Sequence, residues 1–111
     1  MIKISFVLIA VVAVQLILAP SISRADDHKG MSKIKLLLID GQNNHDWKRC
    51  SPVMIDTLNA TGRFSIERAT IAKEDIANFK PDFYKYEVVL SNYNGEPWLQ
   101  ETQDSFVKYM K

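Results

Sequence analysis

The stretch Ile34 to Asp40, in one-letter code IKLLLID, decides the fold of this chain. It is a short, nearly continuous apolar run that ends at the polar pair Asp40-Gly41. Such a run is typical of a strand that is buried on both faces, as in a parallel sheet covered by helices on each side. We therefore predict a central strand of an α/β domain over residues 34–39.

A helix is predicted to follow at Ser51-Pro52. Ser51 can cap free backbone N–H groups, and Pro52 fits the first helical position, where its missing N–H costs nothing. Gly62 is expected to close this helix in the left-handed conformation. Helical spacing places four side chains on the inner face: Val53, Met54, Thr57 and Leu58.

The rest of the chain continues the alternation. We expect a strand over residues 64–69, a short helix over 74–79, a strand over 86–90 and a helix that begins at Pro97. The expected core face of the last helix comprises Leu99, Phe106, Val107 and Met110. This order predicts a flavodoxin-like, doubly wound parallel sheet in three α/β/α layers. Because only three strands are present, we expect the chain to be a truncated domain that ends after the third strand and its helix.

The first 25 residues have the features of a signal peptide. Lys3 precedes an uncharged apolar run over residues 4–19, which is shorter than the roughly 20 residues of a membrane-spanning helix. Pro20 interrupts the run, and the small residues Ser23 and Ala25 predict cleavage after Ala25. Residues 26–32 are polar and predict a flexible tether. The protein is therefore expected in the periplasm or outside the cell and free of the membrane; the alternative is an uncleaved N-terminal anchor.

Charge and cysteine content restrict the partners. The formal net charge of the full chain is +1, and the loss of Lys3 and Arg24 with the signal keeps it near zero, so nothing attracts the protein to nucleic acid. Cys50 is the only cysteine, which excludes an internal disulfide. It lies near a predicted helix start after two cations, but a buried, inert thiol is the favoured interpretation. The sequence does not determine the oligomeric state, and a homo-oligomer is possible.

Two polar loops, over residues 40–47 and 92–97, are expected to form the binding site. In open parallel sheets, ligands bind beyond the carboxyl ends of the strands, at the point where the strand order reverses. In the flavodoxin-like order this point lies between the first and third strands, which these two loops follow. Topology and chemistry thus predict the same crevice.

The side chains of these loops favour a neutral, hydroxylated ligand such as a sugar. Amides offer hydrogen-bond donors and acceptors, carboxylates accept from hydroxyl groups, and aromatic rings offer flat apolar faces. His45 and Asp46 are the candidates for proton transfer. The alternative is that these residues close turns, cap helices or fill the core. The candidate ligand-binding residues are Asp40, Gln42, Asn43, Asn44, Trp47, Asn92, Tyr93, Asn94 and Trp98.

Other chemistries fit the sequence less well. Asp40, His45 and Asp46 do not have the spacing of a recognised metal site, so neither a metal nor another cofactor is predicted. No glycine-rich phosphate loop is present, and Cys50 lies too far from its strand for a nucleophile turn.

Residues 35–47, followed by Ser51-Pro52, resemble the start of the ThuA-like (trehalose-utilisation) domain, and residues 86–95 with Trp98 agree with the same family. The resemblance runs from about residue 33 to the end and suggests the exported forms found in bacteria that degrade polysaccharides. It implies a fold similar to that of class I glutamine amidotransferases and a link to the use of trehalose or a related disaccharide or keto-sugar.

Domains of this family are over twice as long, and the turn at which amidotransferases keep their cysteine would come after Lys111, so no glutaminase activity is implied. Three hypotheses follow for the protein: an enzyme or part of one, a non-catalytic sugar-binding module, or a truncated inactive fragment.

Overall fold

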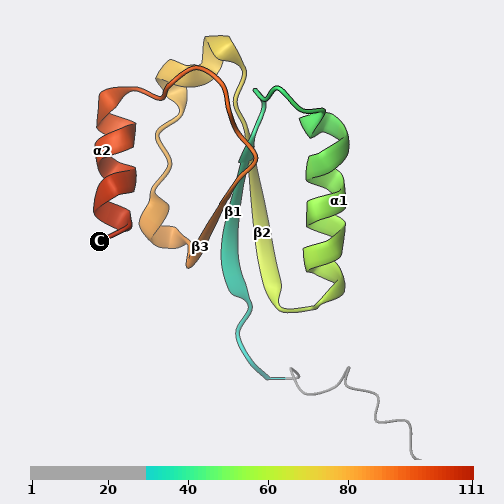
Figure 1. Ribbon diagram of the computed structural model, residues 1–111. Helices are drawn as coiled ribbons and strands as arrows, with labels where there is room; N and C mark the ends of the chain where they lie inside the picture. The colour runs from blue at the N-terminus through green and yellow to red at the C-terminus, as the bar shows by residue number, and fades with distance from the viewer. Residues whose placement is uncertain (1–29) are drawn as a thin grey trace, which may run out of the picture.

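The computed structural model describes residues 30–111, in which helices cover both faces of a parallel sheet (Figure 1). The predicted signal peptide and residues 26–29 of the predicted tether lie outside the described residues. The elements in chain order are β1 (Ile34–Asp40), α1 (Trp47–Ala60), β2 (Phe64–Thr70), the 3-10 helices η1 (Lys73–Asn78) and η2 (Phe83–Lys85), β3 (Val88–Ser91) and α2 (Gln100–Tyr109).

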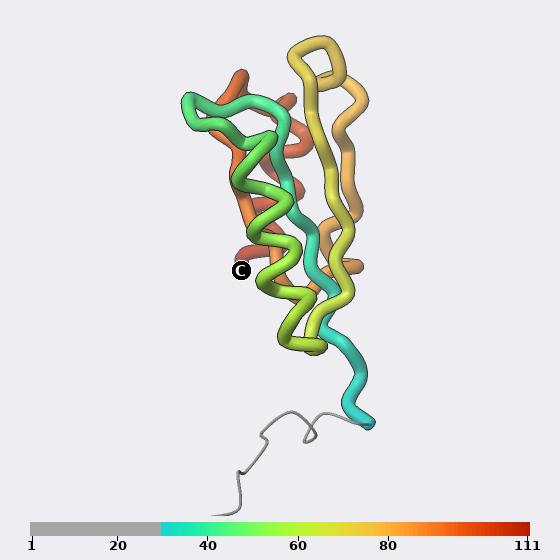
Figure 2. Tube along the Cα trace, turned by 90° about the vertical axis from the view of Figure 1, so that its right-hand side faces the viewer, coloured from blue at the N-terminus to red at the C-terminus, as the bar shows by residue number. Residues whose placement is uncertain are grey.

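The sheet has the strand order β2-β1-β3, and both pairings are parallel. Leu36 of β1 is opposite Ile66 of β2 and Val88 of β3. This confirms the predicted parallel α/β sheet with the first strand in its centre. α1 covers one face, and α2 with the two 3-10 helices covers the other (Figure 1). The quarter-turn view in Figure 2 shows that the chain leaves β1 and β2 at the same end of the molecule.

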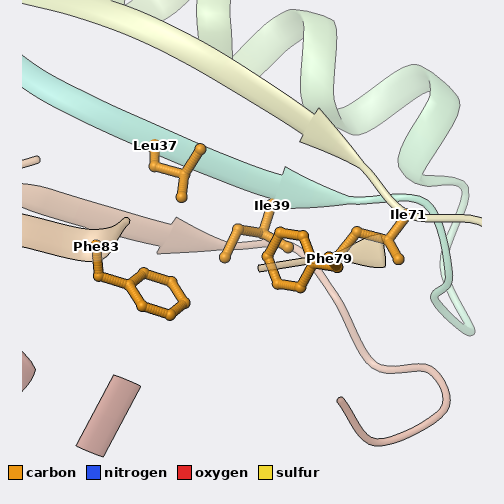
Figure 3. Close-up of a cluster of buried hydrophobic side chains, with 5 residues drawn as sticks. All are labelled: Leu37, Ile39, Ile71, Phe79 and Phe83. Atoms are coloured by element: carbon orange, nitrogen blue, oxygen red, sulfur yellow. The ribbon is translucent and has the colours of Figure 1, made fainter. Parts of the chain in front are cut away.

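β1 is buried because successive side chains point to opposite faces and both faces are covered. Leu37 and Ile39 contribute to the core cluster under α2, together with Ile71, Phe79 and Phe83 (Figure 3). The alternate side chains, Leu36 and Leu38, point toward α1 and are at most 2% exposed. The apolar run thus supplies both hydrophobic layers of the domain.

The predicted start of α1 was wrong by more than one turn, because Pro52 was expected at the first helical position. The helix begins at Trp47, and the Asp46 carboxylate caps it by accepting a hydrogen bond from the Arg49 N–H at 3.3 Å. Pro52 therefore lies inside the helix. The earlier start also changes the inner face, because Ser51 is fully buried whereas Val53 is 64% exposed. The inner face consists of Ser51, Met54, Ile55 and Leu58, which are buried or half-buried.

The predicted start and face of α2 were also wrong in part. The helix begins at Gln100, and its inner face is Thr102, Phe106 and Tyr109, at i, i+4 and i+7. Phe106 was predicted correctly, but Val107 and Met110 are 50% and 68% exposed.

Smaller differences concern the short elements. β3 begins at Val88, because the Tyr86 N–H donates to the Phe83 carbonyl and ends η2. The short helix predicted over residues 74–79 is the 3-10 helix η1. Gly62 has a φ of 68°, which confirms the left-handed position after α1.

Among the helices of residues 30–111, none has the length and apolar composition that a membrane-crossing segment needs.

Candidate functional site

The loops that follow β1 and β3 lie against each other at the carboxyl ends of the strands. The Asn92 N–H donates to the Ile39 carbonyl at 2.8 Å, and the Asn94 N–H donates to the Gln42 carbonyl at 2.8 Å. These backbone hydrogen bonds continue the β1–β3 pairing beyond the sheet. The two segments predicted to face each other are therefore in contact.

Between the loops lies an open hollow of about 600 Å³. Five of the predicted ligand-binding residues line it: Gln42, Asn43, Asn44, Trp47 and Asn94. The remaining lining residues, which were not among the predicted ones, are Gly41, Gly95, Glu96 and Pro97. The wall is rich in amides and carries one indole ring.

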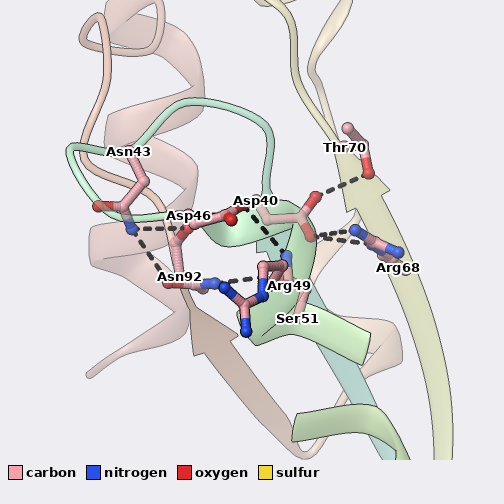
Figure 4. A network of polar contacts seen from close by, with 8 residues as sticks. All are labelled: Asp40, Asn43, Asp46, Arg49, Ser51, Arg68, Thr70 and Asn92. Atoms are coloured by element: carbon pink, nitrogen blue, oxygen red, sulfur yellow. Dashed lines mark hydrogen bonds and ion pairs between the residues drawn. The ribbon is translucent and has the colours of Figure 1, made fainter. Parts of the chain in front are cut away.

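A chain of amide hydrogen bonds joins the two loops to α1 (Figure 4). Asn43 Nδ2 donates to Asn92 Oδ1 at 3.0 Å and to the Asn92 carbonyl at 3.2 Å. Asn92 Nδ2 in turn donates to the hydroxyl of the fully buried Ser51 at 3.0 Å. Both ends of the Asn92 amide thus have protein partners. Asn92 positions the loops. Ser51, which was predicted only as a helix cap, contributes to this positioning.

Gln42 forms a second tie between the loops. Its Oε1 accepts from the Glu96 N–H at 3.1 Å, and its Nε2 donates to the Ile71 carbonyl at 3.4 Å. A Cβ atom at Gly95 would overlap the Gln42 side chain, so glycine permits this close approach. At the rim, Asn94 Nδ2 donates to Asn44 Oδ1 at 3.4 Å.

Asp40 lies beneath the site and is fully buried. Its Oδ2 is 2.8 Å from both Nε and Nη2 of Arg68, and its Oδ1 accepts from the Thr70 hydroxyl at 2.7 Å (Figure 4). The Arg68 guanidinium also lies 5.9 Å from the centre of the Trp47 ring. Asp40 does not line the hollow, and these contacts make it an anchor for β2 and, through Arg68, for Trp47.

The proton-transfer candidates, His45 and Asp46, lie on the exposed outer part of the first loop. Neither lines the hollow. Asp46 caps α1, and the His45 imidazole makes no hydrogen bond to the described residues. Their side chains are accessible to a bound molecule that extends beyond the hollow.

Tyr93 and Trp98 pack behind the second loop, against the core. The ring of Trp98 is 5.1 Å from that of Phe79 and 6.0 Å from that of Tyr93, measured between centroids. The Tyr93 hydroxyl donates to the Glu96 carbonyl at 2.6 Å. Burial, and to a lesser degree the Glu96 carboxylate, raises the pKa of Tyr93. These two rings support the second loop from behind. For Trp98 this agrees with the alternative interpretation, in which the ring fills the core.

The prediction of a buried thiol at Cys50 was wrong. It is exposed, not buried, because the helix that begins at Trp47 turns its Ser51 neighbour inward.

The comparison with solved structures found a crystal structure of a ThuA-like protein from Parabacteroides merdae. The two chains are 38% identical and superpose with a TM-score of 0.67 over 70% of this chain and 29% of that one. A scan against protein-family models and a search of curated proteins each found no match. This chain spans less than a third of the length of its structural neighbour. In sequence and in its flavodoxin-like α/β fold, the chain is similar to the N-terminal part of a ThuA-like protein.

Proposed function

We propose that this ThuA-like protein is exported and binds a neutral sugar, trehalose or a related disaccharide or keto-sugar, in the hollow between the loops after β1 and β3. The observation that carries the proposal is the hollow itself, which lies where the strand order reverses and is lined by amides and an indole ring. Ligand sites in sheets of this kind form at that position. The ThuA-like neighbour supports the family resemblance, which implies the connection with sugar use.

The chemistry of the wall supports a hydroxylated ligand. Amide groups both donate and accept hydrogen bonds, as each sugar hydroxyl does. The indole of Trp47 offers an apolar face to the C–H side of a pyranose ring. The ties through Gln42 and Asn92 hold the two loops in place before a ligand arrives, which reduces the entropy cost of binding.

Calorimetric titration with trehalose, other disaccharides and keto-sugars tests this proposal. We expect Trp47→Ala to weaken sugar binding about tenfold, equivalent to about 1.4 kcal/mol. Trp98→Phe is the matched control, because its ring packs against the core and does not line the hollow. Absence of binding for every sugar in the panel, or equal loss in both variants, would contradict the proposal.

His45 and Asp46 distinguish an enzyme from a binding module. If the protein is an enzyme, we expect His45→Ala to lower turnover about 100-fold while the affinity for sugar changes little. Sugar binding without turnover in the wild type would favour the non-catalytic module. A broad, non-cooperative unfolding transition without sugar binding would favour the inactive fragment.

Export is tested by locating the site at which the signal peptide is cleaved. N-terminal sequencing of the protein recovered from outside the cytoplasm is expected to start at Asp26. Replacing Ala25 by a bulky residue is expected to block this cleavage.

A further inference from the structure

Glu96 differs from every other residue that lines the hollow. The remaining lining residues described above are glycine, proline, tryptophan and neutral amides, so Glu96 supplies the only ionisable side chain of this wall. Its side chain is 49% exposed. The proposed sugar site therefore carries a single negative charge, and that charge is accessible to solvent and to a ligand.

The backbone of Glu96 is fixed on both sides. Its N–H donates to Gln42 Oε1 at 3.1 Å, and its carbonyl accepts from the Tyr93 hydroxyl at 2.6 Å. The preceding residue, Gly95, packs closely against the Gln42 side chain. These contacts fix the backbone from which the Glu96 side chain extends, without a ligand to order it.

One cation faces the carboxylate. Lys73, at the start of η1, places its Nζ 3.2 Å from Glu96 Oε1, and its own side chain is 75% exposed. Exposed ion pairs of this kind are weak and are screened by salt. Lys73 also lies outside the lining of the hollow. The pair therefore lowers the negative field at the wall but leaves the carboxylate able to accept hydrogen bonds from a ligand.

We propose that Glu96 determines the specificity of the hollow: its carboxylate accepts hydrogen bonds from hydroxyl or amino groups of a sugar and excludes sugar acids. This inference rests on the proposed function, because it concerns the same hollow. A carboxylate that extends from this fixed backbone, in an otherwise neutral wall, attracts an ammonium group, tolerates a hydroxyl group and repels a second carboxylate.

Three ligands of nearly equal shape test this inference by calorimetric titration at neutral pH and low salt. They are trehalose, an analogue with an ammonium group in place of one hydroxyl, and the corresponding uronic acid. We expect the wild type to prefer the amino sugar over the uronic acid at least about tenfold. Glu96→Gln should reduce this preference to less than about threefold, whereas Lys73→Met should increase the preference.

Glu101→Gln is the matched control, because Glu101 also forms an exposed ion pair, with Lys80, but does not line the hollow. It should leave the preference unchanged. Thermal unfolding verifies that each variant is folded. If trehalose binds but Glu96→Gln retains the wild-type preference, the inference is overturned and the proposed function stands. If none of the three ligands binds the wild type, the proposed function fails and the inference fails with it.

Discussion

At the scale of single residues, Asp40 was predicted to bind a ligand, but its contacts in the structure anchor β2 to β1. Its carboxylate is fully buried and is satisfied by Arg68 and Thr70 of β2. The parallel register places Arg68 opposite Leu38 and Thr70 opposite Asp40. Sequence reasoning could not identify this pairing, because the partners are 28 and 30 residues away and meet only once the register of β1 and β2 is known.

Arg68→Met is expected to lower the free energy of unfolding by about 3 kcal/mol, because it leaves the buried Asp40 carboxylate without its cation. Urea denaturation followed by circular dichroism measures this loss. The double variant Asp40→Asn, Arg68→Met should recover most of it, since no unpaired charge then remains buried. Arg63→Met, at an exposed arginine that forms no ion pair within residues 30–111, is the control. A loss below about 1 kcal/mol for Arg68→Met would show that Asp40 does not depend on this partner.

At the scale of elements, β1 was predicted almost to the residue because its apolar composition alone requires burial on both faces. The helix starts were predicted less well, because at each of them the signal in the sequence competes with another interaction. Asp46 caps α1 although Ser51-Pro52 is also a typical start. At α2, Pro97 would permit an earlier start, but the Trp98 carbonyl accepts from Gln103 Nε2 at 2.6 Å and the Trp98 ring packs against the core. A local cap thus determines the start of α1, whereas the contacts of Trp98 accompany the later start of α2.

The face of α2 gives a direct test at this scale. Phe106 packs against Phe83, with ring centroids 5.1 Å apart, whereas the adjacent Val107 is 50% exposed. We expect Phe106→Ala to lower the free energy of unfolding by about 3 kcal/mol and Val107→Ala to lower it by less than about 0.5 kcal/mol. Urea denaturation of the two variants measures the difference. Similar losses would indicate that the helix is rotated relative to the structure described.

At the scale of the whole molecule, strand order was sufficient to predict where the two loops meet. Strand order does not distinguish the residues that line the hollow from those that hold the two loops together. Asn92 and Asn94 are both loop asparagines, yet Asn92 uses both ends of its amide on protein partners and Asn94 lines the hollow. Glu96 was missed because one carboxylate after a glycine is not distinctive. These roles depend on the hydrogen bonds between the loops, and such bonds leave no periodic signal in a sequence.

The stability of the whole domain is expected to fall at alkaline pH because of Tyr86. This tyrosine packs against the core cluster, and its carbonyl accepts a hydrogen bond from the Tyr109 hydroxyl at 3.0 Å. Burial, assisted by the nearby Glu67 carboxylate, raises the pKa of Tyr86 from 10.0 to about 12. The folded protein therefore favours the neutral phenol. This contribution to stability is complete below pH 10 and is lost as the pH rises through about 12.

Urea denaturation at intervals between pH 8 and about pH 11.5 tests this expectation through the difference between variants. The wild type should lose about 1–2 kcal/mol more of its unfolding free energy over this range than Tyr86→Phe, which keeps the ring but cannot ionise. Tyr93, whose pKa is also raised, contributes in the same direction to both proteins, so the difference isolates Tyr86. Tyr84→Phe, at a tyrosine that is 69% exposed, should follow the wild type. Parallel pH profiles for the wild type and Tyr86→Phe would show that the phenol of Tyr86 does not couple ionisation to folding.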